Sequence, residues 1–198
     1  MIDSPRAMVV ALTFALGACA TGSAPDAGSS RGAVPDLIGA QVMVMPVQAT
    51  RGVAGNATAE LVDALRARGR SVRWIIPDTL RAALARAPAL DVPLDALPVG
   101  VFLRVQVNRL GDPMFGYLRR LNALTGARVA LIPVEVRYRP ATAERPGAVE
   151  FVAALVNAET GYVGWFGVVE GEAGEAASPR ALASAADALA RLLVRSPS

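Results

Sequence analysis

The sequence has no histidine and no lysine, and its 198 residues include a single cysteine, Cys19. Without histidine, the chain lacks the commonest general base and the commonest metal ligand of proteins. A lone cysteine forms neither an intramolecular disulfide nor a thiolate metal cluster. These absences exclude zinc hydrolases, Ser-His-Asp hydrolases, thiol proteases and haem proteins. We therefore expect no catalytic residue, no metal site and no cofactor.

The basic residues are all arginine, and the formal net charge is only +3 although the pI is about 9.7. Abundant arginine and alanine are typical of a GC-rich gene. No basic run carries interleaved aromatic residues, as nucleic-acid-binding segments do, so we expect no nucleic-acid partner. A hydrophobic content of 53% provides enough apolar material for a folded core.

A polar start over residues 1–6 precedes an apolar, uncharged run over residues 7–18. A membrane span takes about 20 apolar residues, so this shorter run is typical of a signal peptide. It ends in Leu-Gly-Ala directly before Cys19, which resembles the bacterial lipobox. In that motif, small residues admit the signal peptidase and the cysteine thiol accepts the lipid. We predict that residues 1–18 are a cleaved lipoprotein signal peptide and that Cys19 is lipidated.

The predicted lipid defines a location and a domain boundary. Three acyl chains, as on mature bacterial lipoproteins, anchor a protein permanently because each buried methylene contributes about 0.8 kcal/mol. Residue 20 is alanine and not aspartate, which by the rule for lipoproteins predicts the periplasmic face of the outer membrane. In a cell with one membrane, the lipid anchor predicts the extracytoplasmic face of the plasma membrane. Residues 19–36 are rich in Gly, Ser, Ala and Pro and are interpreted as a flexible tether. Residues 37–198 form the predicted domain.

Hydrophobic periodicity predicts alternating strands and helices in this domain. We expect helices that begin after Asn56, Asp78 and Ser178, and a shorter helix over residues 114–124. We expect strands over residues 41–47, 71–76, 101–107, 128–138, 149–156 and 162–169. The order β-α-β-α-β-(α)-β-β-β-α predicts a single α/β domain with a mixed β-sheet and helices.

Two positions carry specific expectations about the backbone. Pro133 falls inside a predicted strand, where it requires an edge position or a β-bulge. Gly161 closes the hairpin loop of residues 157–161, where glycine can adopt the left-handed conformation.

Several phrases of the domain resemble a family of envelope proteins. The matching stretches are VMVMPV, SVRWIIPDTL, VGVFLRVQVNRLG and the hairpin VNAETGYVGWFGVVEGEAG with the alanine-rich helix that follows. They are similar to the family that includes the N-terminal domain of TolB, the curli-secretion protein CsgG and the penicillin-binding-protein activator LpoB. Asn157 stands where the family usually has aspartate in the hairpin. The resemblance implies an envelope location and non-catalytic protein–protein work, and it transfers no contact residues.

The segment over residues 114–124 is the candidate contact surface. Its apolar residues recur at helical spacing, while Arg119 and Arg120 project from the other side. In one interpretation, the apolar face only covers the sheet and the arginines are solvated. In the other, Tyr117, Arg119 and Arg120 meet an envelope protein partner or the anionic membrane surface.

Two hypotheses of function follow from these features. The first is a membrane-anchored envelope lipoprotein that binds a protein partner without catalysis. The alternative is a lipoprotein that binds a small ligand or hydrolyses one without histidine, using Asp, Glu and Arg. A deep pocket with two convergent carboxylates would favour the alternative.

Overall fold

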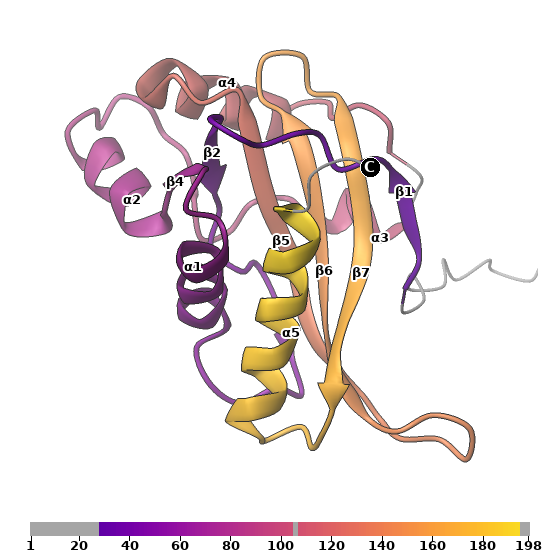
Figure 1. Ribbon diagram of the computed structural model, residues 1–198. Coiled ribbons are helices and arrows are strands. Elements are labelled where there is room, and N and C mark those ends of the chain that lie inside the picture. Colours follow the sequence, from indigo (N-terminus) through magenta and orange to yellow (C-terminus); the bar gives the residue numbers. More distant parts are fainter. Residues whose placement is uncertain (1–27, 105–106, 195–198) are drawn as a thin grey trace, which may run out of the picture.

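A seven-stranded mixed sheet lies at the centre of the computed structural model, which describes residues 28–104 and 107–194 (Figure 1). The strand order is β1-β7-β6-β5-β2-β4, and β3 pairs with β5. Strands β2 to β5 are parallel where they pair, whereas β5, β6, β7 and β1 are antiparallel neighbours. The strands are β1 (Ser30–Gly32), β2 (Gln41–Val44), β3 (Thr50–Arg51), β4 (Arg73–Ile75), β5 (Val129–Arg139), β6 (Ala148–Asn157) and β7 (Val163–Ala173).

Helices cover both faces of the sheet, and each face has its own hydrophobic core (Figure 1). One core joins α1 and α5 to the sheet through residues such as Leu61, Leu189 and Trp165. The other joins α2, α3 and α4 to the opposite face through residues such as Leu80 and Leu118. The helices are α1 (Ala57–Arg68), α2 (Pro77–Ala85), α3 (Gly100–Arg104), α4 (Met114–Thr125) and α5 (Pro179–Leu193). The predicted single α/β domain with a mixed sheet is confirmed.

The two helices of the first layer begin where their sequences predict. The side chain of Asn56 accepts a hydrogen bond from the Ala59 N–H at the start of α1, and Gly69 caps its end. The side chain of Ser178 accepts from the Ala181 N–H at the start of α5. Arg68 of α1 donates to both carboxylate oxygens of Asp187 in α5 at 2.6 and 2.9 Å, which ties the two helices together.

The two backbone expectations for the sheet are confirmed. The register of β5 against β6 shifts between Pro133 and Glu135, so a bulge accommodates the proline. Gly161 has a φ of 71°, and its N–H donates to the carbonyl of Asn157 at 2.8 Å.

The predicted strand over residues 101–107 is wrong, because residues 100–104 form α3. Alternation would bury Val101, yet Val101 is 39% exposed. Phe102 is buried instead and stacks on Phe166 of β7, with ring centres 6.0 Å apart. No position beside β5 is left for this segment either, since β2 and β3 pair with the side of β5 that β6 leaves free. Tertiary packing overrides the strand propensity of this segment.

Two further details differ from the sequence interpretation. Residues 30–32, which the sequence assigns to the tether, form β1 and pair with residues 165–167 of β7. Asp78 does not cap α2: the N-cap is Ile76, Pro77 occupies the first turn, and Asp78 pairs with Arg81. Proline at the start of the helix displaces the cap by two residues.

Candidate functional site

Helix α4 carries the three residues that the sequence selects for partner contact. No side chain caps its first residue, but Asp112 Oδ1 accepts from the Gly116 N–H at 3.0 Å and so satisfies one free amide of the first turn. At the other end, Gly126 adopts a φ of 74°, and the Asn122 side chain donates to the Ala127 carbonyl. The helix is therefore complete despite Gly116, and the predicted span of residues 114–124 is confirmed to within one residue.

Packing fixes α4 on the sheet and determines which face is left to solvent. Met114, Leu118 and Leu121 are buried in the core on this side of the sheet. Phe115 approaches the β6–β7 hairpin loop so closely that a Cβ built on Gly161 would lie 3.0 Å from the Phe115 ring. The start of α4 is thus held against the hairpin, and its outer face is presented as a rigid surface.

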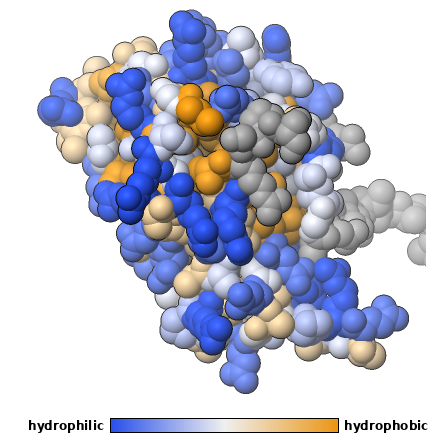
Figure 2. Space-filling view, viewed as in Figure 1, coloured by the Kyte–Doolittle hydropathy of each residue, from blue (hydrophilic) through white to orange (hydrophobic). Residues whose placement is uncertain are grey.

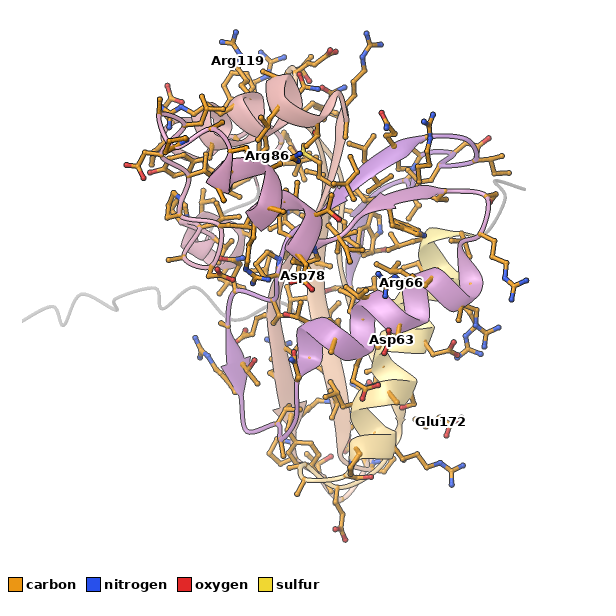
Figure 3. All side chains as sticks on the ribbon, turned by 90° about the vertical axis from the view of Figure 1, so that its left-hand side faces the viewer. Asp63, Arg66, Asp78, Arg86, Arg119 and Glu172 are labelled. Carbon is orange, nitrogen blue, oxygen red and sulfur yellow. The ribbon has the colours of Figure 1, made fainter. Side chains whose placement is uncertain are left out.

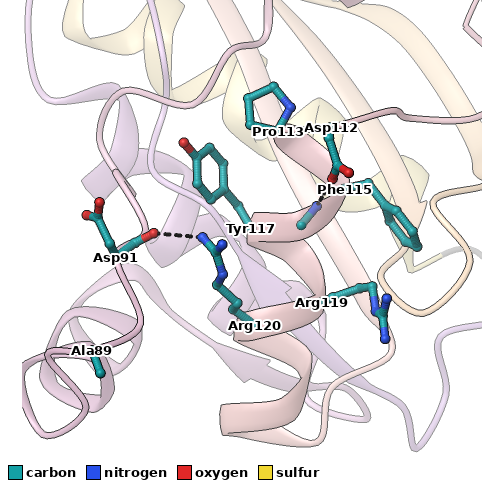
Figure 4. A pocket seen from close by; sticks show the side chains of 9 residues that line it. Ala89, Asp91, Asp112, Pro113, Phe115, Tyr117, Arg119 and Arg120 are labelled. Atoms are coloured by element: carbon teal, nitrogen blue, oxygen red, sulfur yellow. Dashed lines mark hydrogen bonds between the residues drawn. The ribbon is translucent and has the colours of Figure 1, made fainter.

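Each arginine of the candidate surface lies over an aromatic ring of the same helix (Figure 4). The guanidinium carbon of Arg119 lies 5.7 Å from the centre of the Phe115 ring, and that of Arg120 lies 5.6 Å from the centre of the Tyr117 ring. Arg120 Nη1 also donates to the carbonyl of Asp91 at 3.0 Å. Stacking of this kind contributes about 0.5–1 kcal/mol at an exposed site, so it favours these rotamers of both side chains before any partner binds.

A strip of small residues separates the two stacked arginines. Residues of a helix follow one another at about 100° around its axis, so Gly116 and Ala123, seven residues apart, fall on nearly the same line. Arg119 lies on one side of that line and Arg120 on the other, and Figure 4 shows them pointing to different sides of the helix. We call this strip the α4 furrow. Ala123 is exposed, and Gly116 is half-buried.

A groove of about 650 Å³ lies over this part of α4 and reaches the connection that follows α2. Its acidic residues, Asp91 and Asp112, lie at opposite sides in Figure 4. Asp91 contributes its carbonyl to Arg120, and Asp112 is bonded to the Gly116 amide. The two carboxylates therefore do not converge on one point. The groove is lined by Ala89, Asp91, Asp112, Pro113, Phe115, Gly116, Tyr117, Arg119 and Arg120.

A second groove, the linker groove, has a different character. It has a volume of about 400 Å³ and lies where the segment after β1 crosses the ends of β5, β6 and β7. Pro35, Val129 and Leu155 give it an apolar lining, and Tyr162 beside them is 54% exposed. Figure 2 shows hydrophobic side chains exposed between charged ones on the face that carries α1 and α5. The linker groove carries no charged residue, so it lacks the groups for acid–base chemistry.

Sequence reasoning found the arginines and Tyr117 of this site but missed Phe115, Gly116 and Asp91. The spacings Phe115–Arg119 and Tyr117–Arg120 are the signal for the stacking, because residues three and four apart are neighbours on a helix. Asp91 gives no such signal, since its contact depends on the course of the chain after α2. Cys19 and the signal peptide lie outside the described residues. In residues 28–104 and 107–194, no cluster of three acidic, cysteine or histidine side chains could hold a metal, and no helix is long and apolar enough to cross a membrane.

No protein-family model and no curated protein sequence matches this chain. Among solved structures, the chain is similar to the PelC dodecamer from Paraburkholderia phytofirmans, at 18% identity and a TM-score of 0.39, over 84% of this chain and 97% of that chain. It is similar to lipoprotein GNA1162 from Neisseria meningitidis, at 13% identity and a TM-score of 0.39, over 72% and 87% of the two chains. It is also similar to LpoB from E. coli, at 14% identity and a TM-score of 0.43, over 85% and 82%. The links to LpoB, TolB and CsgG that the sequence resemblance implies stay predictions.

Proposed function

We propose that this protein is an envelope lipoprotein that is anchored by a lipid on Cys19 and binds a protein partner without catalysing a reaction. The expected location is the periplasmic face of the outer membrane, or the outer face of the plasma membrane in a cell with one membrane. The partner surface is the outer face of α4, with Tyr117, Arg119 and Arg120. The observation that carries this proposal is the pair of stacked, exposed arginines on a helix whose other face is fixed in the core.

The course of the chain favours a protein partner over the membrane surface at α4. The segment between Cys19 and Ser30 spans at most about 38 Å, since residue 30 is held in β1. Strand β1 is one edge of the sheet, and β4 is the other. The α4 groove extends to Asp91, beyond α2, which contacts β2 near the β4 edge (Figure 1). An anchor that leaves from β1 keeps that edge within about 38 Å of the lipid, while the groove extends towards the opposite edge of the sheet.

The alternative of a hydrolytic or small-ligand lipoprotein receives less support. Hydrolysis by two carboxylates requires both groups to converge on one substrate. In the α4 groove, Asp91 and Asp112 lie at opposite sides, and each has a structural role in the loop or helix that carries it. The linker groove has no charged lining residue. Neither groove provides the constellation that the alternative needs.

Site-specific photocrosslinking in the cell tests the proposed function. A photoreactive amino acid replaces Tyr117 in the full-length protein, and a matched variant carries it at Asp63, an exposed residue of α1. We expect a discrete crosslinked protein from position 117 and none from position 63. The same adduct should weaken when Arg119→Glu and Arg120→Glu are added. Crosslinks only to lipid, or no difference between the two positions, would contradict a partner surface on α4.

A further inference from the structure

Neither Arg119 nor Arg120 pairs with an acidic side chain in the part of the chain that the structure describes. Some arginines elsewhere pair with carboxylates: Arg68 pairs with Asp187, Arg81 with Asp95, and Arg139 with Glu150. Arg119 and Arg120 form no ion pair with a carboxylate of residues 28–104 or 107–194, and their polar contact among these residues is the Asp91 carbonyl. A carbonyl leaves most donors of a guanidinium free, since each guanidinium carries five N–H groups.

The positions of the two arginines on α4 favour an extended partner segment over a helical one. They lie on either side of the α4 furrow, the line on the helix surface that joins the small residues Gly116 and Ala123. A chain laid along the furrow would have one guanidinium on each side. Side chains of an extended segment alternate in direction, so neighbouring residues of that segment would point towards different arginines. A helix would not fit in the same way, since its side chains on one face lie three and four residues apart.

We propose that the α4 furrow binds an extended, carboxylate-bearing segment of the protein partner, with Arg119 and Arg120 each holding one carboxylate. This inference rests on the proposed function, since it names the chemistry of the same surface. Guanidinium and carboxylate form charge-assisted, bidentate hydrogen bonds, which give geometric specificity as well as affinity. The stacked rings keep both guanidiniums oriented, so little side-chain entropy is lost when the segment binds.

The acidic residues around the groove limit where the segment lies. Asp112 is at the start of α4, and its Oδ1 is bonded to the Gly116 amide. Asp91 is exposed and turns its carbonyl, not its carboxylate, to Arg120 (Figure 4). An acidic segment is repelled at the Asp112 end and is favoured over the second half of the helix, towards Ala123. The furrow therefore binds a short acidic stretch and not a long polyanion.

Titration of the full lipidated protein, held in a neutral detergent, tests this inference. The probe is an amidated decapeptide built on Ser-Pro-Glu-Glu repeats, in which proline keeps the chain extended. Its control has glutamine in place of every glutamate. We expect the acidic peptide to bind at least about tenfold more tightly than its glutamine form, and to lose affinity as salt rises. Arg119→Glu with Arg120→Glu should remove this difference.

Two matched variants separate the furrow from general charge. Arg66→Glu with Arg70→Glu changes the net charge by the same amount, and these exposed residues lie on and just after α1. Figure 3 shows Arg66 well away from Arg119 of α4. We expect this pair to reduce binding less than about twofold, because screened charges that far away act weakly. Ala123→Gln keeps every charge and fills the half of the furrow where the segment is expected, at an exposed position. It should weaken peptide binding while the melting temperature, measured in parallel, stays unchanged, because alanine and glutamine both favour helix.

Equal binding of the acidic and glutamine peptides, or binding that survives the double reversal on α4, would overturn the proposal. Vesicles of phosphatidylglycerol provide the membrane arm, with phosphatidylcholine vesicles as the control. If only the anionic vesicles bind and the double reversal abolishes this binding, the furrow recognises lipid and the proposal is wrong. If position 117 still crosslinks to a protein while no acidic peptide binds, the proposed function stands and the assigned chemistry fails.

Discussion

Arg139 and Glu150 lie on adjacent strands, and Arg139 Nε donates to Glu150 Oε1 over 2.9 Å. The Glu150 side chain has no exposed surface, while that of Arg139 is 20% exposed. Arg137 donates to the other oxygen of Glu150 at 2.8 Å, and Arg139 also reaches Glu170 at 2.8 Å. These ion pairs therefore join the end of β5 to the start of β6, where the hydrophobic core ends.

Replacing Glu150 by Gln should destabilise the fold strongly. The substitution keeps the shape but leaves Arg137 and Arg139 without their buried counter-charge, and breaking a buried pair in this way costs about 3 kcal/mol. Chemical unfolding in urea measures this loss. Glu172→Gln is the control, because that side chain is 70% exposed and lies 4.0 Å from Arg180, so we expect a change within about 0.5 kcal/mol. Similar losses in both variants would show that the network contributes no more than a surface pair.

The sequence predicts most of this fold because its strong signals are local. The caps at Asn56 and Ser178, the proline bulge at Pro133 and the left-handed Gly161 depend on residues next to them in the chain. Each of these features depends on the chemistry of one residue and its neighbours in the chain, so the sequence alone predicts it.

The errors fall where a distant partner decides the structure. Residues 101–107 alternate like a strand, but β5 already has neighbours on both sides, and Phe102 finds its partner in Phe166. Residues 30–32 have a tether-like composition, yet they pair with the edge of β7 and form β1. For the candidate site, the two aromatic–arginine spacings are visible in the sequence, whereas the contact of Arg120 with Asp91 joins residues 29 positions apart.

Gly161→Ala should weaken the contact between the hairpin and α4. Gly161 has a φ of 71°, where alanine is strained, and the added Cβ would lie 3.0 Å from the Phe115 ring and 3.1 Å from the Leu110 carbonyl. We expect a loss of about 2 kcal/mol in the free energy of unfolding. The control is Gly111→Ala, because nothing lies within 4 Å of a Cβ at that position.

Thermal unfolding of both variants, followed by circular dichroism, separates the two effects. Gly111→Ala should leave the melting temperature within a degree or two, or raise it slightly, because it only restricts the unfolded chain (about 0.4–1 kcal/mol at most). If Gly161→Ala melts together with Gly111→Ala, the hairpin loop adapts freely and does not hold the start of α4.

Cys19→Ser should release the protein from the membrane. The hydroxyl of serine is not the acyl acceptor of the lipobox, so the variant should remain as the unprocessed precursor or appear in the soluble fraction. Incorporation of labelled palmitate, together with membrane fractionation, measures both outcomes. As a control, Ala20→Ser changes the next residue and should leave acylation intact. A Cys19→Ser protein that is still cleaved after residue 18 and still requires detergent for extraction would contradict the lipobox interpretation.

Removal of β1 should destabilise the domain and expose a sheet edge. A protein that begins at residue 28 retains β1, whose Arg31 lies over the Phe166 ring at 5.2 Å and whose backbone pairs with β7 at Trp165. A protein that begins at residue 37 lacks these contacts and leaves the β7 edge unpaired. We expect both to unfold cooperatively, with melting temperatures that do not change in EDTA or reductant. The shorter protein should be less stable by about 2 kcal/mol, as urea unfolding would measure.

The unpaired β7 edge gives this prediction a second readout. Exposed strand edges pair with other chains, so the shorter protein should also self-associate as its concentration rises, which light scattering detects. Arg31→Ala in the longer protein is the matched control: it removes the contact with Phe166 but keeps the backbone pairing, and it should cost no more than about 1 kcal/mol without self-association. Equal stability and equal mass of the two truncated proteins would mean that residues 28–36 act only as a tether. In that case, the span between lipid and domain would be longer than the 38 Å or so that the pairing of β1 imposes.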